Sequence, residues 1–167
     1  TLNGKFTPAQ RTLYDIVLAA QVAAIKATKP GKRFTDPHDA ATRVLAQGML
    51  DVGLLDEKKH GNVDDVLRSG AYRQFYMHRT GHWMGMDVHD CGDYTEPGSQ
   101  PRPEKDAQGQ PVMRKPSRIL KPGMVLTVEP GIYLENWGGV RVEEDILVTE
   151  DGCEILTHLP NALEVLG

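Results

Sequence analysis

Residues 124–148, MVLTVEPGIYLENWGGVRVEEDILV, contain two runs in which apolar and polar side chains alternate. Alternation with a period of two is the pattern of a half-buried β-strand. The stretch between them, residues 135–139, is rich in glycine and lacks the alternation, so it is the predicted turn. We therefore expect residues 124–133 and 140–148 to form an antiparallel hairpin that pairs around Asn136.

Pairing around that turn brings acidic side chains together. Glu129 falls opposite Glu143, and Arg141 lies on the same face of the hairpin. In the adjacent row Thr127 falls opposite Asp145, unless a β-bulge shifts the register. Directly opposed carboxylates about 4 Å apart repel by several kcal/mol where water is scarce. A bound dication, the arginine or a shared proton would relieve that repulsion, whereas water would screen it on a fully solvated face.

Residues 75–90 hold three of the six histidines in the chain, His78, His82 and His89. Imidazole is the commonest transition-metal ligand and the usual proton carrier near neutral pH. Apolar side chains separate the histidines, which predicts an extended, partly buried segment with polar groups set into an apolar wall. The alternative is a partly buried strand and turn whose histidines have no chemical role. Because the hairpin offers glutamates and an arginine as well, we favour a metal centre.

The first half of the chain is predicted to be helical. Residues 7–10, TPAQ, have the form of a capping box with proline at the first helical position. Apolar residues then recur at helical spacing, which predicts a helix over 8–28 and a second one over 36–52. Asn62 is the predicted cap of a short third helix that ends near Leu67.

Two other regions are interpreted as lying outside the site. His38, in the first turn of the second helix, and His60, in a charged loop, are interpreted as solvated bystanders. Residues 94–116 are rich in proline, glycine and charged residues. Such a composition buries too little apolar surface to order itself, so a flexible insertion loop on the surface is predicted.

Composition limits the classes of function. The chain has 167 residues and a formal charge of −4, which suits one domain and lacks the basic excess of a nucleic-acid-binding protein. No apolar run reaches the roughly 18 residues of a membrane span, and two cysteines fit a reducing compartment. We therefore expect a cytoplasmic protein with neither nucleic-acid nor membrane partners. Because the chain opens at Thr1 without a methionine, we interpret it as a fragment.

The order and spacing of three motifs resemble a known family. The motifs are His78-x3-His82-x2-Gly85-x3-His89-Asp90, Thr127-Val-Glu-Pro-Gly-Ile-Tyr133 and Arg141-Val-Glu143-Glu-Asp145. Over essentially the whole chain this pattern resembles the C-terminal part of a pita-bread metallopeptidase. The subgroup it resembles most is Xaa-Pro aminopeptidase (aminopeptidase P), with prolidase close behind. The resemblance implies an α+β fold, with a curved antiparallel sheet and helices packed on its outer face, of which residues 1–167 would be the C-terminal portion.

The resemblance also implies a site for two metal ions, usually Mn²⁺, with Zn²⁺ or Co²⁺ as alternatives. By motif position His82 matches the histidine ligand of the family, and Glu129 and Glu143 match its two glutamate ligands. The other two ligands of the family are aspartates, which would precede Thr1. The resemblance therefore implies an incomplete or empty metal site within residues 1–167, which we expect to be inactive alone.

The implied activity is removal of the N-terminal residue from peptides with proline in the second position. In the implied mechanism, a hydroxide held between two cations attacks the scissile carbonyl and a carboxylate accepts a proton. Glu129 is the candidate proton acceptor, and His89 is the candidate for holding the oxyanion or the substrate. His78 and His89 match histidines that either support the metal ligands or contact the substrate, while Tyr133 and Arg141 match groups of the surrounding proton network.

Three alternatives stay open at this point. Prolidase applies the same chemistry to dipeptides, methionine aminopeptidase takes other substrates, and a non-catalytic binding module would share only the fold. The presence of His82, Glu129 and Glu143 argues against the binding module for the full-length protein. Because proline lacks an amide hydrogen, a proline-specific site must hold its ring by shape, and Trp83 and Tyr133 are candidate walls. The full-length protein is expected to be a homo-oligomer that binds a peptide substrate.

Overall fold

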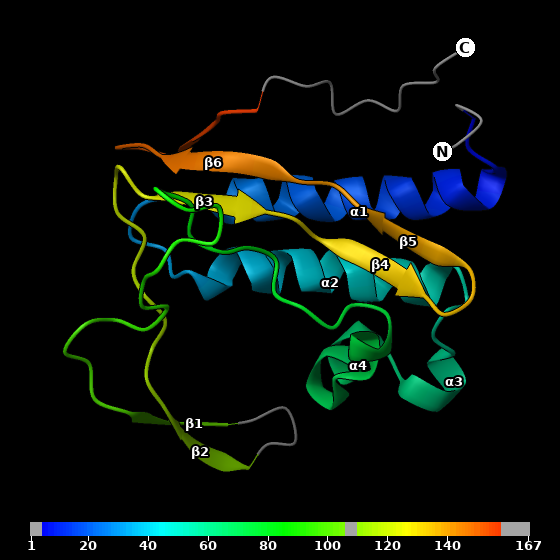
Figure 1. Ribbon diagram of the computed structural model, residues 1–167. Helices are drawn as coiled ribbons and strands as arrows, with labels where there is room; N and C mark the ends of the chain where they lie inside the picture. Colours follow the sequence, from blue (N-terminus) through cyan, green and yellow to red (C-terminus); the bar gives the residue numbers. More distant parts are fainter. Residues whose placement is uncertain (1–4, 106–109, 158–167) are drawn as a thin grey trace.

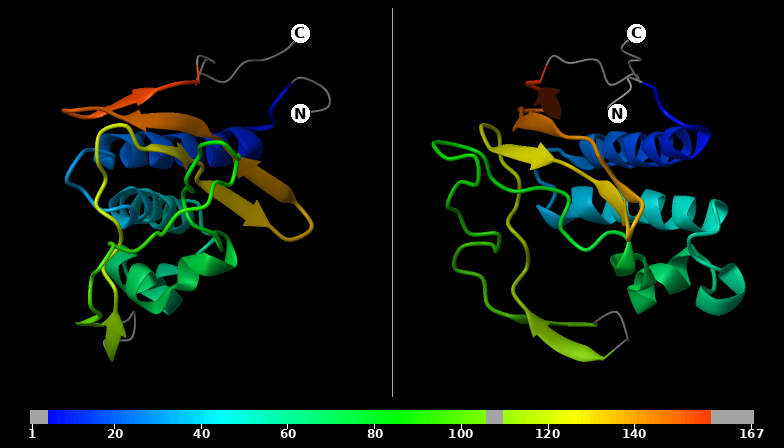
Figure 2. Two further views of the ribbon diagram at one scale, coloured as in Figure 1. Left: turned by 60° about the vertical axis from the view of Figure 1, so that its left-hand side comes forward. Right: turned by 45° about the vertical axis from the view of Figure 1, so that its right-hand side comes forward.

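The computed structural model describes residues 5–105 and 110–157, in which helices pack on antiparallel strands. The two long helices, α1 (Pro8–Ala27) and α2 (Thr35–Asp51), run side by side behind the strands (Figure 1). Two further views show the same order of layers (Figure 2). The predicted α+β architecture is thus confirmed. None of the helices in the described ranges is both long and apolar enough to cross a bilayer.

Helix α1 begins with the capping box that the sequence predicts. The Thr7 hydroxyl accepts a hydrogen bond from the Gln10 backbone amide at 3.3 Å, and the Gln10 side chain accepts one from the Thr7 amide at 2.8 Å. Where α1 meets α2, a Cβ on Gly48 would lie 2.5 Å from Cγ2 of Ile16, so the glycine permits the close approach of the helices. The apolar face of α1 is fully buried at Val17, Ala20 and Ala24.

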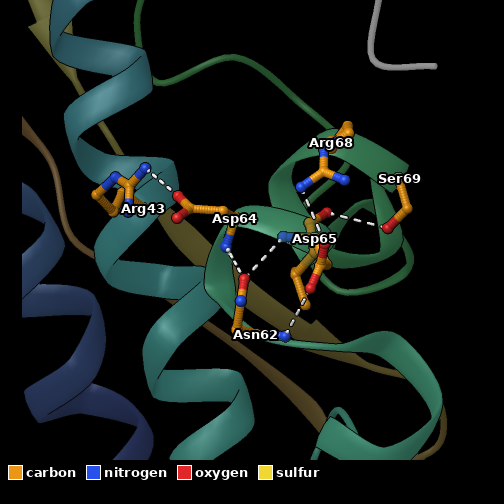
Figure 3. A network of polar contacts seen from close by, with 7 residues as sticks. Arg43, Asn62, Asp64, Asp65, Arg68 and Ser69 are labelled. Atoms are coloured by element: carbon orange, nitrogen blue, oxygen red, sulfur yellow. Dashed lines mark hydrogen bonds and ion pairs between the residues drawn. The ribbon is translucent and has the colours of Figure 1, made fainter. Parts of the chain in front are cut away.

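Two short helices, α3 (Glu57–His60) and α4 (Val63–Ser69), follow α2. The Asn62 side chain caps α4 as predicted, because it accepts a hydrogen bond from the Asp64 amide at 2.9 Å (Figure 3). Arg43 of α2 reaches the Asp64 carboxylate at 2.6 Å and joins the two helices. Helix α3 occupies the stretch that was expected to be a charged loop.

Within residues 125–148 the strands form two ladders that share the same two chain segments. Strands β3 (Val125–Val128), β6 (Glu144–Val148) and β7 (Cys153–Ile155) form a three-stranded antiparallel sheet with β6 in the centre. Strands β4 (Gly131–Leu134) and β5 (Gly138–Arg141) form the second ladder. The segment of β3 and β4 therefore runs antiparallel to the segment of β5 and β6.

The predicted register of the hairpin is confirmed. Thr127 pairs with Asp145 in the first ladder, and Gly131 pairs with Arg141 in the second. Both pairs follow from a turn centred on Asn136, so no bulge intervenes between the two ladders. Asn136 adopts a φ of 58°, in the left-handed region that asparagine tolerates better than most residues.

Each predicted strand is nevertheless interrupted once. Glu129 and Pro130 on one side, and Val142 and Glu143 on the other, lie between the two ladders. Pro130 has no amide to donate. The Glu129 amide donates instead to the carbonyl of Thr80, outside the hairpin, at 2.6 Å. The interruption therefore lies at the two opposed glutamates.

Residues 75–90, predicted to be extended, are mostly irregular but follow the free edge of β3. The Thr127 amide donates to the His82 carbonyl at 2.9 Å, and Trp83 forms an isolated antiparallel bridge with Leu126. The histidine segment thus lies beside β3, on the edge opposite to β6, close to the glutamates.

The interpretation of residues 94–116 as an unstructured loop is wrong in part. Strands β1 (Arg102–Lys105) and β2 (Pro111–Arg114) form an antiparallel hairpin that lies apart from the other strands (Figure 1). The Glu96 carboxylate anchors the start of the segment by accepting a hydrogen bond from the Ile119 amide at 2.7 Å. Cross-strand pairing joins these two strands without a buried apolar face, which composition alone does not reveal. The flexibility of the segment stays a prediction.

Candidate metal centre

The histidine segment approaches β3 so closely that a side chain is excluded at Gly81. A Cβ built on Gly81 would overlap the carbonyl oxygen of Thr127. On either side of this glycine, the Thr80 carbonyl and the His82 carbonyl both accept hydrogen bonds from β3 or its continuation. The backbone contact therefore fixes the position of His82 relative to Glu129.

His82 presents one ring nitrogen to the glutamates. Its Nδ1 lies 2.9 Å from the Trp83 carbonyl oxygen. Because a carbonyl oxygen only accepts hydrogen bonds, Nδ1 carries the proton in this contact, and Nε2 is the ring nitrogen left to face a ligand. Nε2 lies 3.3 Å from Oε1 of Glu129, and both side chains are only 14% exposed.

Glu129 and Glu143 lie together as the hairpin register predicts, and His82 converges on them from the histidine segment. One ligand atom from each lies within 4.8 Å of the other two. The buried Thr127 hydroxyl donates to Oε1 of Glu129 at 3.1 Å and accepts a hydrogen bond from the His82 amide at 3.1 Å. Arg141 lies on the same side, with its Nε 3.8 Å from Oε2 of Glu129.

Electrostatics at this cluster leave part of the carboxylate repulsion uncompensated. Burial raises the pKa of Glu143, and the negative charge of Glu129 raises it further. Arg141 acts in the opposite direction on Glu143 but does not cancel the shift. The hydroxyl of Tyr133 beside Arg141 raises the pKa of the guanidinium, which stays positively charged.

His78 and Tyr133 form a second polar pair next to the cluster. Nδ1 of His78 lies 2.7 Å from the Arg79 carbonyl oxygen, and its Nε2 lies 2.7 Å from the Tyr133 hydroxyl. The carbonyl again requires the proton on Nδ1, so Nε2 of the neutral ring accepts from Tyr133. This arrangement gives the tyrosine and the histidine a proton that they can share. His78 and Tyr133, which come from distant parts of the sequence, thus lie together.

His89 lies at the edge of this centre rather than within it. Its ring centroid is 4.2 Å from that of His82, but it is not among the three convergent ligands. The preceding part of the loop is open to solvent, with Met86 99% exposed. Trp83, a candidate wall of a proline pocket, is instead buried in the core, where it packs on Phe34 at 4.6 Å between ring centroids. The wall interpretation is therefore wrong for Trp83.

The interpretation of His38 as a solvated residue is also wrong. Nδ1 of His38 lies 3.0 Å from the Thr80 hydroxyl, which in turn lies 2.6 Å from the hydroxyl of buried Tyr76. Burial lowers the pKa of His38 to about 4, and the charges of Arg79 and Arg73 act in the same direction. The alternation of His78, Thr80 and His82 was the only sequence signal for this contact. It does not reveal that His38 of α2, 42 residues earlier, supplies the partner.

The donors of the cluster suit a divalent cation. Two carboxylates offer hard oxygen atoms and one imidazole offers a nitrogen, a combination that binds manganese or zinc. The hydrogen bond from Nδ1 of His82 to a carbonyl is the outer contact that metal-binding histidines usually make. A cation between Glu129 and Glu143 would also remove the repulsion that Arg141 relieves only in part.

Comparison with known proteins gives consistent matches. A family model described as metallopeptidase family M24 matches residues 1–150. The Xaa-Pro aminopeptidase of Haemophilus influenzae is 42% identical over 165 residues, which cover 93% of this chain and 33% of that protein. The Xaa-Pro dipeptidase of Rattus norvegicus is 36% identical over 188 residues, which cover 97% of this chain and 36% of that protein.

The fold is similar to solved structures as well. Zinc-substituted E. coli aminopeptidase P in complex with product matches with a TM-score of 0.75 and 38% identity, over 94% of this chain and 33% of that one. This similarity confirms the predicted pita-bread fold. The chain spans about a third of the length of the curated relatives that it matches.

Proposed function

This chain belongs to metallopeptidase family M24, and on that premise we propose that the protein is a metal-dependent aminopeptidase specific for peptides with proline in the second position. It would release the residue that precedes the proline. The observation that carries the proposal is the convergence of one imidazole nitrogen and two carboxylates within 4.8 Å. A non-catalytic module would not need a donor set that stays electrostatically unfavourable without a cation.

His82, Glu129 and Glu143 would hold the metal. Manganese is the ion we propose, because the carboxylate oxygens are hard ligands and only one donor is an imidazole. Zinc would also fit these donors, and a related aminopeptidase P has been obtained in a zinc-substituted form. A bound divalent cation supplies a Lewis acid that polarises the scissile carbonyl and activates water.

The residues around the ligands would then handle the protons and position the substrate. Glu129 would accept the proton of the attacking water, and the Thr127 hydroxyl at 3.1 Å would hold its carboxylate in place. The His78–Tyr133 pair would transfer a proton to the leaving group or hold a proton near it. Arg141 would keep positive charge beside Glu129, and His89 would contact the substrate from the exposed loop.

The length of the accepted peptide separates the proposal from prolidase. Relatives of both names resemble this chain, an Xaa-Pro aminopeptidase and an Xaa-Pro dipeptidase. Cleavage of a tripeptide such as Ala-Pro-Ala would support the aminopeptidase, whereas cleavage of Ala-Pro alone would indicate prolidase. A peptide that begins Met-Ala tests the third alternative, methionine aminopeptidase.

The ligand assignment is tested by substitution in the protein that contains this chain. We expect His82→Ala, Glu129→Ala and Glu143→Ala each to abolish hydrolysis and to lower the metal content of the purified protein. Glu150→Ala serves as the matched control, because this glutamate is exposed and outside the cluster. Full metal content and turnover in any of the three ligand variants would refute the role of that residue.

A further inference from the structure

We propose that a positively charged cavity beside His78 binds a carboxylate group of the peptide substrate downstream of the scissile bond. This inference rests on the proposed function and assigns a specificity pocket to the same site. The cavity has a volume of about 400 Å³ and is mostly polar. Its lining includes the histidines His38 and His78 and the charged residues Asp39, Arg73, Arg79 and Arg114.

The three arginines come from three separate parts of the fold. Arg73 lies on the short helix η1 (Ala71–Gln74), Arg79 lies in the histidine segment and Arg114 ends strand β2. The β1–β2 hairpin stands apart from the other strands in Figure 1, yet its last residue lines the cavity. Convergence from separate elements distinguishes this cavity from a run of charge along one helix.

The positive charge of the cavity exceeds its negative charge, because three arginines and one aspartate line it. Among the residues that the structure describes, none of the three guanidinium groups forms an ion pair. Asp39 is the only carboxylate of the lining; burial raises its pKa, and the charge of Arg79 acts in the opposite direction. The effect of the arginines is seen at His38, where Arg79 and Arg73 add to the lowering of the pKa that burial causes.

A carboxylate fits this lining chemically. A guanidinium presents its donors in a planar fork that matches the two oxygens of a carboxylate, and it stays charged at all ordinary pH values. A group held here would meet positive charge that the protein itself leaves unpaired. Because each charge pair formed is partly exposed, the attraction should weaken as salt is added.

The location of the cavity connects it to the reaction. His78 is both a lining residue and the hydrogen-bond partner of Tyr133, at 2.7 Å. Tyr133 is hydrogen-bonded to Arg141, whose Nε lies 3.8 Å from Oε2 of Glu129, one of the convergent ligands. A peptide held at the cluster therefore has the cavity on the His78 side, where the part that follows the proline can extend by about 3.3 Å per residue.

The carboxylate can belong to the C-terminus of the peptide or to an acidic side chain, and two pairs of substrates distinguish these sources. Ala-Pro-Ala is compared with its C-terminal amide to test the terminal carboxylate. Ala-Pro-Asp amide is compared with Ala-Pro-Asn amide to test an acidic side chain. In the wild-type protein we expect kcat/KM to favour the anionic member of at least one pair by about tenfold, mainly through a lower KM.

Substitution of Arg114 or Arg79 by methionine should bring that ratio close to one. Arg102→Met is the matched control, because Arg102 pairs directly with Arg114 in the β1–β2 ladder but does not line the cavity. This control should keep the wild-type ratio, which should also shrink with added salt. Equal kcat/KM within both pairs, or a ratio that Arg114→Met and Arg79→Met leave intact, would overturn the inference.

Failure of the proposed function gives a different result. If none of the four peptides is cleaved, the peptidase assignment fails while binding still tests the cavity. Calorimetric titration with Pro-Ala and with Pro-Ala amide measures that binding without turnover. Tighter binding of the free acid that Arg114→Met abolishes and Arg102→Met retains would support the cavity, and equal binding of the two would overturn it.

Discussion

Replacing Gly81 by alanine should damage both the fold and the metal centre. The added Cβ would overlap the Thr127 carbonyl, which belongs to the backbone and cannot rotate away. The histidine segment must then separate from β3, where three backbone hydrogen bonds of 2.6, 2.9 and 3.1 Å join them. A displacement on the order of 1 Å takes even the shortest N···O pair to about 3.6 Å, where no hydrogen bond remains. At about 1 kcal/mol for each bond, the expected loss of stability is about 3 kcal/mol.

The same displacement moves His82 away from Glu129, so we expect metal affinity to fall by about 10–100-fold. Urea denaturation measures the first effect, and titration of the metal-free protein with Mn²⁺ measures the second. Gly152→Ala is the control, because a Cβ there meets no atom within 4 Å. Wild-type stability and metal affinity in Gly81→Ala would refute the idea that this contact positions His82.

Four other predictions follow from the structure. His89→Ala should lower turnover by about 10²–10⁴-fold and leave the metal bound, as expected for a substrate or oxyanion contact, and loss of metal would contradict that role. Because the pKa of His38 is lowered from 6.5 to about 4, the folded state binds fewer protons than the unfolded state between these values. Stability should therefore fall by up to roughly 3 kcal/mol as pH drops through that window, and denaturation of His38→Gln should show a smaller fall. Limited proteolysis should cut first within residues 94–116, and shortening them should cost under about 1 kcal/mol, whereas strong amide protection would argue against mobility. Residues 1–167 alone should bind at most one Mn²⁺ weakly and show no turnover, and two tight equivalents by metal analysis would show that further side chains complete the site.

The hairpin register could be predicted because its information is local. Alternation fixes which side chains share a face, and the glycine-rich turn at 135–139 fixes which residues are opposite. Those two facts alone place Glu129 opposite Glu143. The confirmed pairing of Thr127 with Asp145 shows that nothing in the tertiary structure shifts that register.

Contacts between segments that are distant in the sequence were harder to predict. The hydrogen bond between His38 and Thr80 joins a helix to an irregular segment, and no periodicity in either sequence links the two. Trp83 follows His82 directly in the sequence, so a place in the same site could be expected for it. Its side chain instead packs on Phe34 in the core. The β1–β2 hairpin was missed because backbone pairing orders a polar segment without leaving an apolar pattern.

The interruption of the hairpin explains why the metal centre lies where it does. The ladders on both sides of Glu129 and Glu143 keep one register, so the gap does not result from a slip in pairing. Continued pairing would hold two carboxylates face to face, and Pro130 has no amide to contribute. At the interruption the Glu129 amide donates to the Thr80 carbonyl, at 2.6 Å, instead of to the opposite strand. The interruption therefore also holds the histidine segment beside the two carboxylates. Arg141 and the Thr127 hydroxyl stabilise Glu129 only in part, since Glu143 retains a raised pKa. The remaining repulsion favours a cation between the glutamates, and the position of His82 supplies that cation with its third donor.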